Sequence, residues 1–172
     1  MFSLFIFKAT RRLKTEFLVQ LDGAGTDQDA RVVVVGATNR PDELDEAARR
    51  RFVKRIYVPL PDVAGRNQLL RVLLRDADNG LQDEDIAMLV EKTAGYSGAD
   101  IRALANEAAM GPMREIMTSC KMMDITIEQM PEIRFEHFID ALELVAPSVS
   151  QCDLVKYVEW NSQFGTYRNK ME

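Results

Sequence analysis

Two short β-branched segments in the first third of the chain predict strands. Residues 31–36 are apolar on both faces, which is typical of a central strand in a parallel sheet that is covered on each side. Residues 55–58 predict a second short strand, which Pro59 and Pro61 end. Two such strands do not form a stable sheet by themselves. This part of the fold therefore either takes further strands from upstream or is poorly folded.

The remaining pattern is helical. Apolar residues at helical spacing predict a helix over 12–21, followed by a polar loop over 24–30. After Pro61 the same spacing predicts amphipathic helices: one capped by Asp62, one over 85–93, one opened by a capping box at 97–100, one over 135–145 and one over 153–164. The change of pattern places a boundary at 59–61, between an α/β part and a helical part.

Two details of the helical part bear on packing. Gly111-Pro112 is expected to bend or break the helix that begins at 97–100. Met110, Met113 and Met117 share one helical face, and we expect their flexible side chains to fill gaps in the core.

Composition indicates a soluble, globular chain with room for one domain or a domain and a fragment, since 47% of its 172 residues are hydrophobic and 28% are charged. Residues 1–60 hold 11 Lys and Arg against 8 Asp and Glu, whereas 61–172 hold 11 against 19. The acidic second part argues against nucleic acid as a direct partner. The apolar run 2–7 is too short to span a membrane and lacks the features of a signal peptide. We therefore expect no transmembrane segment and a location in the cytosol or nucleus.

Asn39 is the first candidate functional residue. It comes soon after the predicted strand 31–36, at the edge where α/β sheets usually present ligand-binding groups. Its amide can donate to a γ-phosphate oxygen and accept from an attacking water, so it can orient both. The alternative is a turn residue, because Asn before Arg-Pro is common in turns.

Arg50 and Arg51 are the next candidates, and they follow a short helix that is expected to begin near Asp45. A guanidinium is always charged, and its planar fork matches phosphate oxygens. Projected from one subunit into the next, it can stabilise the transition state of phosphoryl transfer. Arg49, the remaining arginine of the run, is expected to be structural. On composition alone, a solvated basic face or a nucleic-acid-binding patch is the stronger alternative.

Gly98 and Ala99 belong to the third candidate motif, the Gly-Tyr-Ser-Gly-Ala-Asp sequence at 95–100. A glycine beside a helix start leaves the backbone accessible, so that a flat ring or a ribose could approach it closely. A helix cap without further function is the alternative.

These motifs in this order, at 32–41, 44–55, 95–100 and 147–165, resemble the second half of an AAA ATPase module of the group that contains spastin, katanin and the fidgetin-like proteins. The resemblance implies an α/β P-loop NTPase fold. Its parts would be an atypical segment at 1–10, a truncated large α/β subdomain at 11–60, an all-helical lid subdomain at 61–145 and a C-terminal helix at 146–172.

The same resemblance implies roles for the candidate residues. Asn39 would be sensor 1, Arg50 and Arg51 would be arginine fingers acting in trans, and Gly98 and Ala99 would lie on the adenine and ribose side of the nucleotide. ATP and Mg²⁺ are the implied cofactors of the complete module. The implied assembly is a ring of like subunits, expected to be a hexamer, that couples ATP hydrolysis to pulling on a protein. Tubulin during microtubule severing and DNA-repair assemblies are the implied targets.

The chain departs from this family where phosphate and Mg²⁺ would be bound. It contains no Gly-Lys-Ser/Thr triplet, and residues 2–8, which hold no carboxylate, stand where a strand ending in Asp-Glu is expected. We therefore expect the 172-residue chain alone to lack ATPase activity and to bind nucleotide weakly. Segment 1–10 suggests a displaced start. The alternative function is a truncated, non-catalytic subunit or regulator that binds AAA rings. No metal site is expected, because His137 is the only histidine and no Cys lies near it.

Overall fold

The structure is a computed structural model that describes residues 15–20, 33–118 and 130–167. It divides into two compact units: unit 1 contains Met1–Tyr57 and Val155–Glu172, and unit 2 contains Val58–Leu154. The division lies beside the 59–61 segment, where the sequence pattern changes. None of the helices in the described ranges has the length and apolar character needed to cross a bilayer.

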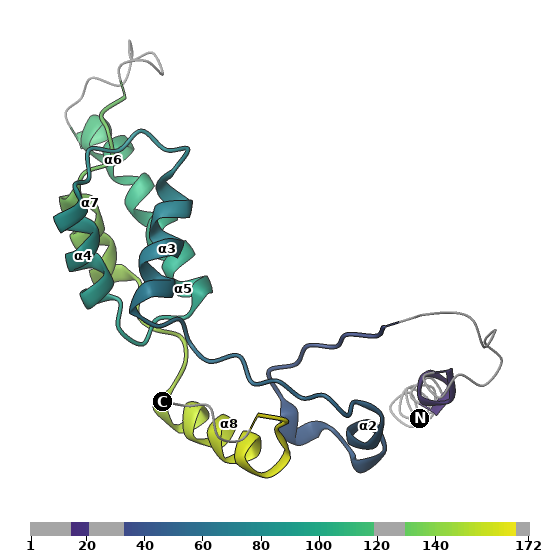
Figure 1. Cartoon of the computed structure of the whole chain (residues 1–172). Helices are drawn as coiled ribbons and strands as arrows, with labels where there is room; N and C mark the ends of the chain where they lie inside the picture. Colours follow the sequence, from purple (N-terminus) through teal and green to yellow (C-terminus); the bar gives the residue numbers. More distant parts are fainter. Residues whose placement is uncertain (1–14, 21–32, 119–129, 168–172) are drawn as a thin grey trace, which may run out of the picture. The chain divides into compact units, whose positions relative to one another are not determined.

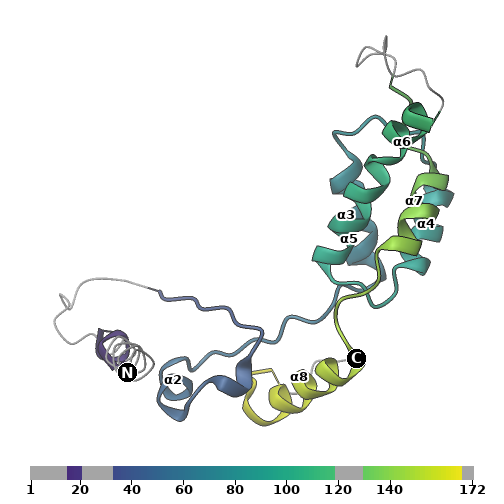
Figure 2. The same cartoon turned by 180° about the vertical axis from the view of Figure 1, so that it is seen from behind.

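Unit 2 is a helical bundle. It contains α3 (Val63–Leu74), α4 (Asp83–Lys92), α5 (Gly98–Ala109), α6 (Gly111–Thr118) and α7 (Phe135–Leu144). Helix α5 packs against α3, α6 and α7, and α3 also packs against α4 (Figure 1; Figure 2 shows the bundle from behind). The largest fully buried apolar side chains at this centre are those of Leu70, Leu89, Ile101, Leu104 and Phe138.

Local capping sets the helix starts in unit 2. The Asp62 carboxylate accepts a hydrogen bond from the backbone N–H of Gly65 at 2.7 Å, which confirms the predicted cap of α3. Ser97 and Asp100 form the predicted capping box of α5. The predicted start of α4 at Asp85 is two residues late, because Asp85 is the third helical residue and its carboxylate accepts from the backbone N–H of Gln82. The predicted break at 111–112 is confirmed, since α5 ends at Ala109 and α6 begins at Gly111.

Unit 1 carries the short helices η1 (Pro41–Glu43) and α2 (Glu46–Arg51), and it includes α8 (Gln151–Phe164) from Val155 onward. Asp45 is the N-cap of α2 and accepts from the backbone N–H of Ala48 at 2.9 Å, which confirms the predicted helix start. Helix α8 begins two residues before the predicted 153. Residues 15–20 are helical as predicted, and the rest of the predicted helix 12–21 and the loop 24–30 lie outside the described residues.

The two predicted strands are wrong as secondary structure. Residues 33–36 and 55–58 are extended but belong to no strand, and residues 31 and 32 lie outside the described ranges. Val33 and Val35 are 86% and 87% exposed, so the expected cover on both faces is also wrong for this segment. The physical reason is that a strand exists only through hydrogen bonds to a neighbouring strand, and the described residues place none beside these segments.

The predicted core role of the methionines is wrong as well. Met110, Met113 and Met117 are each about half exposed. Helix α6 is buried only at its first two residues, Gly111 and Pro112, so the rest of this helix, including two of the three methionines, lies at the margin of the bundle. Helical spacing shows that residues share a face, but not whether another element covers that face.

Candidate functional site

Asn39 lies in an exposed turn of unit 1 that hydrogen bonds hold in place. The Thr38 hydroxyl accepts from the backbone N–H of Arg40 at 3.0 Å. The Tyr157 hydroxyl, on α8, donates to the backbone carbonyl of Asn39 at 3.0 Å. The side-chain amide of Asn39 has no hydrogen-bond partner within the described part of the chain and is exposed. The turn therefore holds the backbone and leaves the amide available for a ligand.

Helix α2 carries the three consecutive arginines, and their surroundings differ. The guanidinium of Arg49 lies over the ring of Phe164, 4.6 Å from its centroid. The side chain of Arg50 is 77% exposed and pairs only locally, with Glu46 one turn earlier. Such an exposed pair contributes about 0–1 kcal/mol and is easily exchanged for another anion. Arg51 donates to the backbone carbonyl of Ala47 at 3.1 Å, also within the helix.

Arg55 supports the end of α2. Its Nη1 donates to the carbonyl oxygens of Arg49 at 2.6 Å and Phe52 at 3.3 Å, and its Nε donates to the carbonyl oxygen of Phe164 at 2.6 Å. The last carbonyls of a helix lack partners within the helix, and a cation beside them is favourable. Arg55 therefore fills a structural position, as Arg49 does, and neither is available to a neighbouring subunit without loss of these contacts.

Gly98 and Ala99 form the exposed first turn of α5 in unit 2. A Cβ placed on Gly98 would lie 3.7 Å from Cδ2 of Leu69, which is an ordinary contact, so packing within unit 2 does not require glycine there. The glycine that the backbone does require is Gly95, which has a φ of +84°.

The rest of this motif binds the chain that follows α7. The Asp100 carboxylate accepts from the backbone N–H groups of Ser97 at 2.8 Å and Ser148 at 3.2 Å. Burial by itself would raise the pKa of Asp100, but these hydrogen bonds outweigh burial and lower the pKa below its usual value. The Tyr96 hydroxyl donates to the carbonyl of Val145, and burial, together with the charge of Asp100, raises the pKa of Tyr96. The motif therefore fixes residues 145–148, a function that its capping pattern did not reveal.

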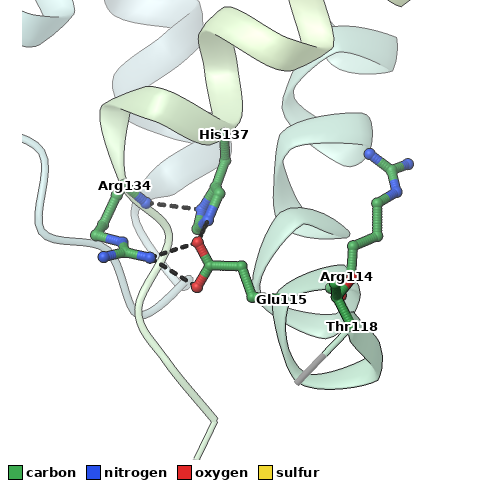
Figure 3. Close-up of polar contacts among 5 residues, drawn as sticks. All are labelled: Arg114, Glu115, Thr118, Arg134 and His137. Carbon is green, nitrogen blue, oxygen red and sulfur yellow. Dashed lines mark hydrogen bonds and ion pairs between the residues drawn. The ribbon is translucent and has the colours of Figure 1, made fainter. Parts of the chain in front are cut away.

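His137 has a structural environment (Figure 3). The backbone N–H of Arg134 donates to its Nδ1 at 3.1 Å, so the ring proton resides on Nε2, which donates to Glu115 at 3.0 Å. Arg134 also pairs with Glu115 at 2.5 Å. The hydrogen bond from His137 and the charge of Arg134 lower the pKa of Glu115. The ring is buried, its Nδ1 caps the start of α7, and its Nε2 joins α7 to Glu115 on α6, so it is not available to a metal. Within 15–20, 33–118 and 130–167, no three His, Cys, Asp or Glu residues gather as metal ligands would.

The structure places the predicted site residues in two groups. Asn39, Arg50 and Arg51 belong to unit 1, on one stretch of chain joined by η1, whereas Gly98 and Ala99 belong to unit 2. Arg55, Tyr157 and Thr166 hold the first group in place, and this supporting role was not predicted from the sequence. The sequence around Tyr157 and Thr166 does not indicate this role, because their partners lie more than 100 positions away.

Models of three known families match this chain. Residues 7–60 match "ATPase family associated with various cellular activities (AAA)", residues 83–127 match "AAA+ lid domain", and residues 113–165 match "Vps4 C terminal oligomerisation domain". The three matches follow the chain in this order, and the last two overlap over residues 113–127.

Similar proteins agree with these matches. Fidgetin-like protein 1 of Xenopus tropicalis is 49% identical over 164 residues, which are 94% of this chain and 24% of that protein. Spastin of Danio rerio is 46% identical over 157 residues, which are 91% of this chain and 27% of that protein. The crystal structure of the FIGL-1 AAA domain has a TM-score of 0.84 and 44% identity, covering 92% of this chain and 53% of that one. The chain thus spans about a quarter of the length of the curated relatives it matches.

Proposed function

Since this chain belongs to the AAA ATPases, in the group that contains fidgetin-like proteins and spastin, we propose that it forms the C-terminal part of a ring-forming ATP hydrolase. In this proposal Asn39 senses the γ-phosphate, and Arg50 and Arg51 act on the active site of a neighbouring subunit. Gly98 and Ala99 lie against the adenine and ribose of ATP. The match of residues 113–165 to an oligomerisation domain supports assembly with other subunits.

The observation that carries this proposal is that the arginines in and just after α2 have different partners. Arg49 is engaged with Phe164, and Arg55 with three backbone carbonyls, whereas the exposed Arg50 pairs only with Glu46 of its own helix. A group that acts on a neighbouring active site has to extend from a fixed support and exchange a weak local partner for a phosphate. Arg50, with its exposed side chain, meets both conditions.

This chain supplies only part of the groups that a complete module would use to bind ATP and Mg²⁺. The amide of Asn39 and two guanidinium groups can contact phosphate oxygens, but the 172 residues contain no Gly-Lys-Ser/Thr triplet and no apolar segment that ends in Asp-Glu. Bound Mg²⁺ would supply charge neutralisation at the β- and γ-phosphates. We expect the isolated chain to hydrolyse no ATP, and a turnover of about 1 s⁻¹ from the purified chain would contradict this.

Mixed rings test the role of the arginines. Intact fidgetin-like protein 1 of Xenopus tropicalis is mixed with this chain, either unchanged or with Arg50→Ala and Arg51→Ala, and ATP turnover per intact subunit is measured at matched ratios. An arginine acting in trans contributes about 10³–10⁵-fold to turnover. Intact subunits whose neighbour carries both alanines should therefore lose their ATP turnover, while those beside the unchanged chain keep it.

The control is the double variant Arg71→Ala, Arg75→Ala, which removes two exposed arginines in the last turn of α3 and at its C-cap in unit 2. It should behave like the unchanged chain. Co-sedimentation is measured in parallel, because the comparison is valid only when all three chains enter the rings equally. Equal turnover with the unchanged chain and the alanine variant, at equal association, rejects the proposed role.

A second candidate is a non-catalytic subunit or regulator that joins rings of intact relatives, which the match of residues 113–165 to an oligomerisation domain also supports. An immunoblot against residues 61–172, followed by intact mass, distinguishes the two. A much larger product supports the active ATPase, and a product near 19.5 kDa supports the regulator. For the complete protein we propose a polypeptide target in the cytosol or nucleus, with tubulin and repair assemblies as the candidates that the group suggests.

A further inference from the structure

We propose that the last turn of α8 and the two residues after it, Phe164-Gly165-Thr166, hold α2 in the orientation that presents Arg50 and Arg51. Arg55 is the positioning residue that joins the two elements. This inference deepens the proposed function, because it rests on Arg50 and Arg51 acting on a neighbouring site. All the residues concerned belong to unit 1. We call these contacts the C-terminal clamp, made of Arg49, Arg55, Phe164, Gly165 and Thr166.

The guanidinium of Arg55 makes the first part of the clamp. It donates to the carbonyl of Arg49 inside α2, to that of Phe52 at the end of α2, and to that of Phe164 at the end of α8. One planar group thus binds carbonyls at the ends of two helices, and its partner Phe164 lies 109 positions after Arg55 in the sequence. Its fixed fork determines the position of both helix ends at once, which the single point charge of a lysine cannot do.

A pair of backbone contacts makes the second part. The backbone N–H of Arg55 donates to the Thr166 hydroxyl at 2.8 Å, and the backbone N–H of Thr166 donates to the Arg55 carbonyl at 2.9 Å. The Thr166 hydroxyl in turn donates to the carbonyl of Val53 at 3.4 Å. Thr166 therefore binds the segment that follows α2 at two residues, Val53 and Arg55.

Aromatic and glycine residues complete the clamp. Phe164 lies under the guanidinium of Arg49, and its ring is 5.4 Å from that of Trp160. Gly165 donates its backbone N–H to the carbonyl of Asn161 at 2.8 Å, and a Cβ on Gly165 would lie 2.5 Å from that same oxygen. Only glycine permits this close return of the chain, which brings Thr166 to Arg55.

The clamp explains why consecutive arginines have different partners. It uses Arg49 and Arg55, whereas Arg50 pairs only with Glu46 inside α2. A helix of six residues is too short to be stable or oriented by itself. Misplacement of a catalytic group by about 1 Å can lower the rate about 10²-fold, so the clamp determines whether the fingers reach their target.

Two variants test the clamp in the full chain. Arg55→Lys keeps the charge but loses the fork, and Thr166→Val keeps the shape but loses the hydroxyl. The matched control is Arg102→Lys, an exposed position on α5 in unit 2. Amide hydrogen exchange of the free chain should become at least about tenfold faster over residues 47–53 in both variants, and stay unchanged over 98–109, because the lost hydrogen bonds protect only α2. The control should match the unchanged chain at both segments.

Mixed rings give the functional readout. Both clamp variants should associate like the unchanged chain but lower the turnover of intact subunits about 10²-fold. Unchanged exchange over 47–53 in both variants overturns the clamp. Faster exchange with full turnover overturns its role in presenting the arginines. If Arg50→Ala, Arg51→Ala also leaves turnover unchanged, the proposed function is rejected together with that role, while the exchange data still decide whether the clamp exists.

Discussion

Gly111→Ala separates helix propensity from packing in unit 2. Gly111 is the buried first residue of α6 and precedes Pro112. A Cβ at this position would lie 2.4 Å from Cγ and 2.7 Å from Cβ of His137. The imidazole cannot move aside easily, because its two nitrogens are hydrogen-bonded to Arg134 and Glu115 (Figure 3). The substitution therefore forces α6 and α7 apart.

Two opposing free energies decide the sign. Replacing glycine by alanine in a helix stabilises it by about 0.5–1 kcal/mol. Overpacking a site that cannot relax costs about 1–3 kcal/mol, and a residue before proline loses helical freedom that glycine retains. We expect the cost to exceed the gain, with a net destabilisation of about 1–2 kcal/mol. For the 97-residue unit 2 this lowers Tm by about 4–16 °C.

Thermal unfolding of the full chain, followed by circular dichroism at the helical band, measures the effect. The matched control is Gly98→Ala, because the new Cβ would meet Leu69 at an ordinary 3.7 Å and only the gain in propensity remains. Its Tm should be unchanged or higher. A Tm of Gly111→Ala equal to or above that of the unchanged chain would refute the steric reasoning, since the approach of α6 to His137 would then be relaxed at little cost.

Three further substitutions have expected outcomes that unfolding in urea can measure. Asp100→Asn should lower the free energy of unfolding at neutral pH. The pKa of Asp100 is lowered in the folded state, so its carboxylate stabilises the fold above the unfolded pKa, and this stabilisation is lost as pH falls through the folded pKa. The variant should therefore lose less stability than the unchanged chain between about pH 7 and pH 3, and an equal loss would contradict the hydrogen bonds from Ser97 and Ser148. Trp160→Phe removes an indole N–H that is buried without a partner among the described residues; an unsatisfied group of this kind costs about 1–3 kcal/mol, so stability should stay equal or rise, and a clear loss would reveal a partner. Phe138→Ala, at a fully buried position, should cost about 3–5 kcal/mol, and a cost below about 1 kcal/mol would show that α7 is not central to the bundle.

The candidate site could be predicted from the sequence where its chemistry is local. The order of Asn39, Arg50 and Arg51 along a short segment is visible in the sequence, and their catalytic roles stay predictions. The support of that segment was not predictable, because Arg55 binds Phe164 and Thr166 from the far end of the chain. Neither partner belongs to a recognisable motif together with Arg55.

The sequence by itself determined where most of the α-helices lie and where α2, α3 and α5 begin. Asp45, Asp62 and Ser97 bind backbone N–H groups within their own first turn, so three or four neighbouring residues contain all the interactions that set each helix start. Helical spacing likewise showed which residues share a face.

Only the tertiary structure decided what each face and each extended segment contacts. Residues 33–36 have the composition of a central strand, but no strand lies beside them in the part of the chain that the structure describes. The methionines of α6 lie at the margin of the bundle, because α6 is buried only at Gly111 and Pro112. Both outcomes have the same physical reason. Burial and strand pairing are properties of two segments together, and the second segment is not specified by the residues of the first.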